Sequence, residues 1–224
     1  MSRPQLIVID LDGTLVDSAP DLVFAAQQML EQLGREPVGA EQIRDWVGNG
    51  VNMLVKRVLA GKMDPDEKIN GFDRAYRIFS DLYAANLSER SRLYPGVLEG
   101  LEELRREGFL LACITNKHSR FTGRLLEKVG LSGYFQAVVC GDTYEERKPH
   151  PLPLLKTAER FNIEARNAVM VGDSINDIRA ARAAGFVSVC VPYGYKGRYT
   201  IEEIGADHVV ESLAELPALF AAAV

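Results

Sequence analysis

The stretch that decides the fold, LIVIDLDGTLVDS at residues 6–18, joins an apolar run to two closely spaced carboxylates. Four consecutive apolar residues with no alternating polar position are typical of a strand that is buried on both faces. Asp10 and Asp12 follow this run directly and, in extended chain, point the same way. Two like charges repel at the end of a buried strand, so the sequence predicts that a group of opposite charge meets them there.

Five further apolar runs have the length of buried strands, and segments with a helical apolar period separate most of them. The runs cover residues 110–114, 137–139, 168–171, 187–191 and 208–210. Strands that alternate with helices predict right-handed crossovers and a parallel sheet with helices on both faces. We therefore expect an α/β protein with a doubly wound, Rossmann-like sheet, in which ligands bind beyond the carboxyl ends of the strands.

A helical insertion interrupts this alternation directly after the first strand. Residues 17–88 carry helical apolar patterns and no candidate strand. One of these helices is expected to begin at the DPDE of residues 64–67, where Pro65 suits a first turn. The sequence thus predicts an α/β core, formed by residues 1–16 and 89–224, and an inserted, all-helical subdomain.

The composition and the charge of the chain argue against several kinds of binding partner and metal site. The formal net charge of −5 argues against a nucleic-acid surface, which normally needs a basic patch. No apolar run is long enough to span a membrane, and no signal peptide is evident at the start of the sequence. The cysteines Cys113, Cys140 and Cys190 are far apart, which favours buried thiols in a reducing compartment over a zinc site or a disulfide framework. A cytoplasmic protein with no nucleic-acid or membrane partner is expected.

Polar side chains gather at the predicted strand ends and in one loop. They are Asp10, Asp12, Thr115, Asn116, Lys148, Asp173 and Asp177. The carboxyl ends of parallel strands share one edge of a sheet, so these groups can converge in one crevice. Three converging carboxylates repel unless a cation lies among them, and oxygen ligands of this kind suit Mg²⁺. The alternative is that each aspartate forms a turn or caps a helix, a reading that fits Asp177 best.

A lysine and two neutral donors complete this set. Pro149 keeps Lys148 out of helical geometry, so its ammonium is presented from a loop. Thr115 and Asn116 offer a hydroxyl and an amide that can hold phosphoryl oxygens. A cation, a lysine and neutral donors around a carboxylate nucleophile suit the transfer of a phosphoryl group from a small phosphorylated substrate.

The segments DLDGTLVDS, ITN, KPHP and VGDSIND resemble the four motifs of the haloacid dehalogenase superfamily of phosphohydrolases. The resemblance implies that Asp10 attacks phosphorus and becomes an aspartyl-phosphate. It implies that Asp12 protonates the leaving alkoxide and then deprotonates the hydrolytic water. Mg²⁺ would be held by the Asp10 carboxylate, the Asp12 backbone carbonyl and Asp173, with Asp177 supporting the metal.

A finer resemblance concerns the substrate. The segments DLDGTLVDSAPDL, WVGNG, TNK, KPHPLPLL and VPYGY are similar to the phosphoglycolate phosphatase branch of this superfamily, which implies 2-phosphoglycolate as substrate. The helical insertion resembles the superfamily's C1-type cap. Cap residues that would contact the substrate are Arg44, Gly48, Asn49 and Gly50. The roles of Lys117 and His150 stay open, since Lys117 either reaches the site or lies at the surface.

Other activities share these motifs. A phosphatase of sugar phosphates or pyrophosphate, and a phosphosugar mutase similar to β-phosphoglucomutase, remain alternatives. A non-catalytic receiver module, which also pairs acidic residues around Mg²⁺, is disfavoured because it needs neither a leaving-group acid nor an insertion of about seventy residues. The sequence does not predict an oligomeric state.

Overall fold

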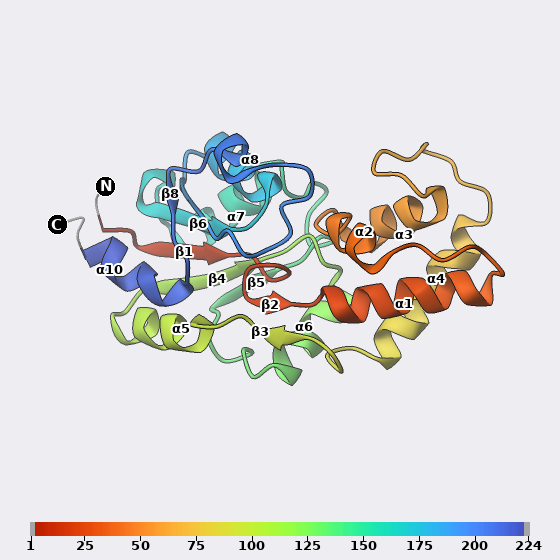
Figure 1. The fold of residues 1–224 in the computed structure, drawn as a ribbon. Coiled ribbons are helices and arrows are strands. Elements are labelled where there is room, and N and C mark those ends of the chain that lie inside the picture. Colours follow the sequence, from red (N-terminus) through yellow and green to blue (C-terminus); the bar gives the residue numbers. More distant parts are fainter. Residues whose placement is uncertain (1–2, 222–224) are drawn as a thin grey trace.

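A computed structural model describes residues 3–221 of the chain and contains a six-stranded parallel sheet (Figure 1). The strand order is β5-β4-β1-β6-β7-β8, with every pairing parallel. The strands are β1 (Leu6–Ile9), β4 (Leu110–Ile114), β5 (Ala137–Val139), β6 (Ala168–Gly172), β7 (Val187–Cys190) and β8 (His208–Val209). The predicted doubly wound α/β fold is confirmed, and the expected strands differ from the observed ones by one residue at most.

Both faces of the sheet are covered, as the unbroken apolar run of β1 requires. Ile7 and Ile9 pack into one hydrophobic cluster, whereas Leu6 and Val8 pack into a second one on the opposite face. The first cluster includes α5 (Val97–Arg106), α6 (Ser119–Lys128) and α10 (Leu216–Ala221), and the second includes α7 (Leu152–Phe161) and α8 (Ile175–Ala184). The helix α9 (Ile201–Ile204) packs separately, against Cys190.

Four helices follow β1 in the sequence and lie beyond the ends of the strands to which the arrows point (Figure 1). They are α1 (Ala19–Gln32), α2 (Ala40–Asp45), α3 (Gly50–Ala60) and α4 (Phe72–Ala85). The helix α4 contacts both α1 and α3, and the core of this helical unit is continuous with that of the sheet.

Two details of the insertion differ from expectation. Two short strands, β2 (Val16–Asp17) and β3 (Arg92–Leu93), pair in antiparallel fashion where the chain leaves and re-enters the α/β core. The helix α4 begins at Phe72 and not near residues 64–67. Residues 64–71 are mostly exposed, so a helix there would have little apolar surface to bury, and Gly71 adopts a left-handed conformation with φ +80°.

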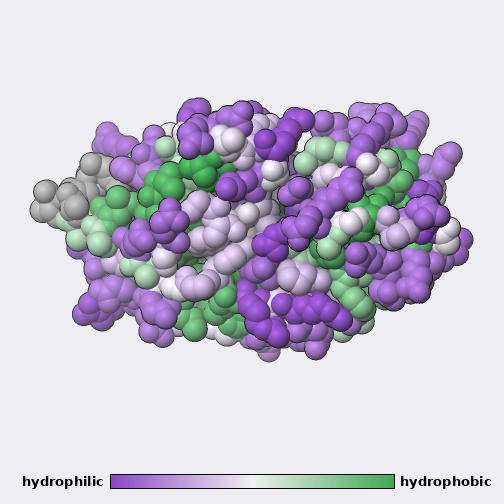
Figure 2. All heavy atoms as spheres, in the orientation of Figure 1, coloured by the Kyte–Doolittle hydropathy of each residue, from purple (hydrophilic) through white to green (hydrophobic). Residues whose placement is uncertain are grey.

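Within residues 3–221, no helix combines the length and the apolar character that crossing a membrane requires. Hydrophilic residues cover most of the face drawn in Figure 2, and hydrophobic ones lie in smaller areas between them. The exposed large hydrophobic side chains of the described chain are dispersed over separate elements, at Leu98, Val138, Leu155 and Val209.

Candidate active site

The register of three neighbouring strands brings the predicted acidic residues to one edge of the sheet. Ile9 of β1 is paired with Cys113 of β4 and with Val171 of β6, so the residues that follow these strands emerge side by side. The Asp10 backbone N–H donates to the Val171 carbonyl at 2.9 Å, which carries the pairing one residue beyond β1. Asp10 and Asp173 thereby arrive at one place from two strands.

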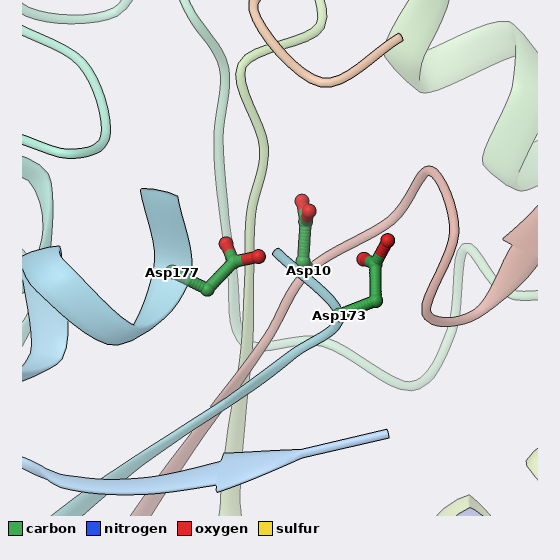
Figure 3. Close-up of side chains that lie close together, drawn as sticks. All are labelled: Asp10, Asp173 and Asp177. Atoms are coloured by element: carbon green, nitrogen blue, oxygen red, sulfur yellow. The ribbon is translucent and has the colours of Figure 1, made fainter. Parts of the chain in front are cut away.

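Asp10, Asp173 and Asp177 point into a common volume (Figure 3). One carboxylate oxygen from each residue lies within 4.8 Å of the others, and all three side chains are buried. Burial raises the pKa of Asp10 to about 7 and that of Asp173 well above its ordinary value, and the neighbouring carboxylates add to both shifts. An oxygen-only donor set that is this unfavourably charged fits a hard divalent cation.

The buried Lys148 ammonium is shared between two of these carboxylates. Its Nζ lies 2.8 Å from Asp10 Oδ1 and 2.7 Å from Asp177 Oδ1, and it also donates to the Ile114 carbonyl. Burial disfavours the charged form, but Asp10 and Asp177 outweigh this and hold the pKa of Lys148 above its usual range. A permanent positive charge therefore contacts Asp10.

Asp12 turns away from this cluster toward a second lysine. Its carboxylate accepts from Ser18 Oγ at 2.5 Å, and its two oxygens lie 2.9 and 3.1 Å from Lys117 Nζ. Gly13, directly after Asp12, turns the chain with φ +90°, and a Cβ at this position would lie 2.3 Å from Asp173 Oδ2. The two neighbouring carboxylates are thus held by different lysines.

Asp173 is held by two hydrogen bonds from distant parts of the chain. Thr14 Oγ1 donates to Asp173 Oδ1 at 2.7 Å, and the Tyr195 backbone N–H donates to Oδ2 at 2.5 Å. The Tyr195 hydroxyl in turn donates to Asp17 Oδ1 at 2.6 Å and accepts from the Ala19 N–H at 2.8 Å. One residue therefore links the carboxylate cluster to the start of α1.

Thr115 and Asn116 follow β4 and differ in what their side chains contact. Thr115 lines the same cavity as Asp10 and Asp12, and its Oγ1 accepts from the Lys117 N–H. Asn116 Nδ2 donates to the carbonyls of Gly48, at 3.1 Å, and Lys148, at 2.9 Å. Within residues 3–221, Asn116 Oδ1 is buried and has no hydrogen-bond partner. The amide therefore holds two loops together.

The four candidate residues of the insertion separate into three groups. Gly48 and Gly50 line the cavity that contains Asp10 and Asp12. Asn49 lines a neighbouring cleft instead. Arg44 is not among the residues that line this cavity: its guanidinium pairs with Asp17 at 3.1 Å and stacks on the Tyr195 ring, 4.9 Å from its centre. Arg44 therefore lies where the helical unit joins the core.

Sequence reasoning left Lys117 open and did not assign roles to Ser18 and Tyr195. Ser18 bonds to Asp12 six residues away, whereas the hydroxyl of Tyr195 bonds to residues 176 and 178 positions away, and no local pattern indicates either contact. His150 accepts a hydrogen bond from the Leu152 N–H at the start of α7, and His118 similarly caps α6. Both histidines are exposed.

Comparison with known proteins identifies the family. A sequence model of the haloacid dehalogenase-like hydrolases matches residues 7–191, a span that includes the ends of β1, β4 and β6. The chain belongs to the haloacid dehalogenase-like hydrolase family. The predicted superfamily is confirmed.

Named relatives match this chain over almost its full length, and a solved structure matches its fold. The chain is 47% identical to a phosphoglycolate phosphatase of Nitrosococcus oceani, over 100% of this chain and 99% of the relative. It is 46% identical to a phosphoglycolate phosphatase of Thiobacillus denitrificans, over 93% and 92% of the two chains. The crystal structure of a predicted phosphoglycolate phosphatase from Haemophilus somnus matches with a TM-score of 0.91 and 32% identity, covering 98% of this chain and 99% of that one. This haloacid dehalogenase-like hydrolase is a phosphatase, and the predicted enzyme class, a phosphoric monoester hydrolase, is confirmed.

Proposed function

We propose that this phosphatase is Mg²⁺-dependent and hydrolyses 2-phosphoglycolate to glycolate and phosphate. The names of its relatives support the substrate. One observation carries the chemistry: Asp10 and Asp12 are held by Lys148 and Lys117 respectively, so the two carboxylates occupy different environments. A nucleophile and an acid two residues apart need such a division, because one must attack phosphorus while the other faces the leaving oxygen.

In the first half of the reaction, an Asp10 oxygen forms a bond to phosphorus while the bond from phosphorus to the alkoxide oxygen breaks. Asp12 donates its proton to that oxygen, and glycolate leaves. In the second half, water attacks phosphorus, Asp12 takes a proton from the water, and the bond to Asp10 breaks to release phosphate. Thr115 and Lys148 orient the phosphoryl group, and Asn116 fixes the loop that carries Lys148.

The residues around Asp10 fit the metal that the family implies. The carboxylates of Asp10 and Asp173 and the backbone carbonyl of Asp12 would hold Mg²⁺, with Asp177 beside them. When bound, the ion would neutralise charge on the phosphoryl oxygens. The close approach of Gly13 to the Asp173 carboxylate, which leaves no space for a Cβ, supports a packed ligand site there.

Residues 17–88 act as the cap in this proposal, on a core formed by residues 1–16 and 89–224. The segment 47–50 supports this role, because Val47, Gly48 and Gly50 line the cavity. The Gly48 carbonyl also accepts hydrogen bonds from Asn116 and Asn176 of the core. A cap in this position would exclude bulk water while the leaving group departs.

Phosphate release from a panel of esters tests the proposal. The panel contains 2-phosphoglycolate, a hexose 1-phosphate, a hexose 6-phosphate and pyrophosphate, each with Mg²⁺ and with a chelator. We expect the highest kcat/KM for 2-phosphoglycolate and loss of activity without Mg²⁺. A higher kcat/KM for another compound of the panel would refute 2-phosphoglycolate as the substrate. Conversion of hexose 1-phosphate to hexose 6-phosphate without phosphate release would indicate a mutase.

The nucleophile is tested by Asp10→Asn, which keeps the size of the side chain and removes its charge. We expect no turnover, with an unchanged circular dichroism spectrum. Asp81→Asn is the matched control, because Asp81 lies on the exposed side of α4 and contacts only Arg120 of the core. Robust activity in Asp10→Asn would contradict an aspartyl-phosphate on this residue.

A further inference from the structure

Lys117 is built into the cavity and does not lie on the surface. Its side chain is 2% exposed, and Nζ lies 4.8 Å from the centre of the Tyr83 ring. Its backbone is fixed on both sides: the N–H donates to Thr115 Oγ1, and the carbonyl accepts from the Gly141 N–H at 2.9 Å. The direction of this side chain is therefore set by the end of β4 and by the loop after β5.

The surroundings of the Lys117 ammonium leave it capacity for another anion. An ammonium has three N–H groups, and Asp12 provides two acceptor oxygens, at 2.9 and 3.1 Å. Among the described residues that line the cavity, Lys117 is the only cation. The opposite wall is apolar, with Leu22, Val51 and Leu54. A carboxylate on a substrate in this cavity would lose its hydration and could recover a charged partner at Lys117, because Lys148 is already shared between Asp10 and Asp177.

The chemistry of a phosphorylated 2-hydroxy acid matches this arrangement. In 2-phosphoglycolate a single methylene separates the carboxylate from the ester oxygen. The group that protonates the ester oxygen is therefore close to the carboxylate as well. Lys117 holds Asp12, the proposed proton donor, so a substrate whose ester oxygen faces Asp12 would bring its carboxylate toward Lys117.

We propose that Lys117 determines specificity, by binding the substrate carboxylate with the same ammonium that holds Asp12 toward the leaving oxygen. This inference rests on the function proposed above. It assigns the selection of short phosphorylated hydroxy acids to a residue of the α/β core that directly follows Thr115 and Asn116, and not to a cation of the insertion such as Arg44.

Two substrates that differ only in the carboxylate test the inference. Ethyl phosphate carries a methyl group where 2-phosphoglycolate carries its carboxylate. We expect the wild-type enzyme to prefer 2-phosphoglycolate by kcat/KM. In Lys117→Met the ratio of the two kcat/KM values should fall by about 10- to 100-fold, the range for losing a hydrogen bond to a charged group. Lys117→Arg should retain more of this ratio than Lys117→Met does.

The ratio separates specificity from a purely positioning role, since loss of Asp12 orientation would slow both substrates by the same factor. Equal losses for both esters would overturn the inference. Lys156→Met is the matched control, because Lys156 is exposed on α7 and pairs only with Glu159. A wild-type enzyme with no preference for 2-phosphoglycolate would overturn the proposed substrate and the role of Lys117 together.

An equilibrium measurement tests the carboxylate contact even if Lys117→Met turns over too slowly for kinetic comparison. Inhibition by glycolate reports on the carboxylate contact without turnover of the inhibitor, so we expect its inhibition constant to rise about tenfold or more in Lys117→Met. Thermal unfolding of the same sample shows that the variant is folded. An unchanged inhibition constant in the folded variant would contradict the assignment.

Discussion

Replacing Asp10 by Asn in the metal-free protein should change how the stability of the fold depends on pH. Burial raises the pKa of Asp10 from 3.8 to about 7 in the folded protein. The folded state therefore binds this proton more tightly than the unfolded chain does. This contribution to stability is complete below about pH 4 and is lost as the pH rises through about 7. At 1.36 kcal/mol per pH unit, the full loss is about 4 kcal/mol.

The magnitude is set by the cluster and not by Asp10 alone. Lys148 contacts Asp10 at 2.8 Å and lowers its pKa, but it also serves Asp177 at 2.7 Å, and burial prevails. In Asp10→Asn, Lys148 keeps Asp177 as its partner, so the substitution does not leave the ammonium without a counter-charge. The variant should therefore gain stability relative to the wild type as the pH rises.

Urea unfolding of both proteins in a chelating buffer, from pH 5 to pH 8, measures this difference. We expect it to grow by about 3 kcal/mol over this range and to level off above about pH 7. Asp142→Asn is a control of opposite sign, because hydrogen bonds from Ser119 outweigh burial and lower the pKa of Asp142. A difference between Asp10→Asn and the wild type that does not vary with pH would refute the reasoning.

Three further predictions concern the same site. The affinity for Mg²⁺ should rise with pH between 6 and 8, because Asp10 must lose its proton to bind a cation. Calorimetry in buffers of different ionisation enthalpy would detect the released proton. A pH-independent affinity would contradict this prediction. Tyr195→Phe removes the hydrogen bonds of the hydroxyl to Asp17 and to the start of α1. Urea unfolding should therefore show a loss of about 2–4 kcal/mol in the free energy of unfolding. A loss below about 1 kcal/mol would contradict a stabilising role for these two hydrogen bonds. A Cβ at Gly194 would lie 2.3 Å from the Asp173 Cβ, so Gly194→Ala should weaken Mg²⁺ binding at least about tenfold. Gly123→Ala, which meets open space on α6, should leave the affinity unchanged.

The strands and their converging carboxyl ends could be predicted because the information is local. A parallel sheet buried on both faces requires continuous apolar runs, and β1, β4 and β6 have them. Once the strands are parallel neighbours, Asp10 and Asp173 have to emerge at the same edge. Residue type and position along the chain suffice for this part of the site.

The contacts that orient the side chains could not be predicted, because they depend on distant residues. The hydroxyl of Tyr195 bonds to residues 176 and 178 positions away in the sequence. Lys117 lies three residues beyond β4, and its direction depends on contacts that include the Gly141 N–H and the Asp12 carboxylate, which are distant in the chain. The start of α4 was misplaced for a related reason, since a local helix signal cannot show that residues 64–71 have little to pack against.

The Gly48 carbonyl has a consequence for the rate at which the cavity can open. Any separation of segment 47–50 from the core must break its bonds to Asn116 and Asn176, at 3.1 and 3.4 Å. Neutral hydrogen bonds of this kind contribute about 0.5–1.5 kcal/mol each, so together they favour the closed arrangement by about 1–3 kcal/mol. Taken alone, a free-energy difference of this size would correspond to about 1–15% open molecules at equilibrium, and the apolar packing between the helical unit and the core adds to it. Asn116 also donates to the Lys148 carbonyl, in the loop that carries the lysine beside Asp10. Movement of Asn116 on opening would therefore also affect the position of Lys148, so that product release and the geometry around Asp10 would be coupled.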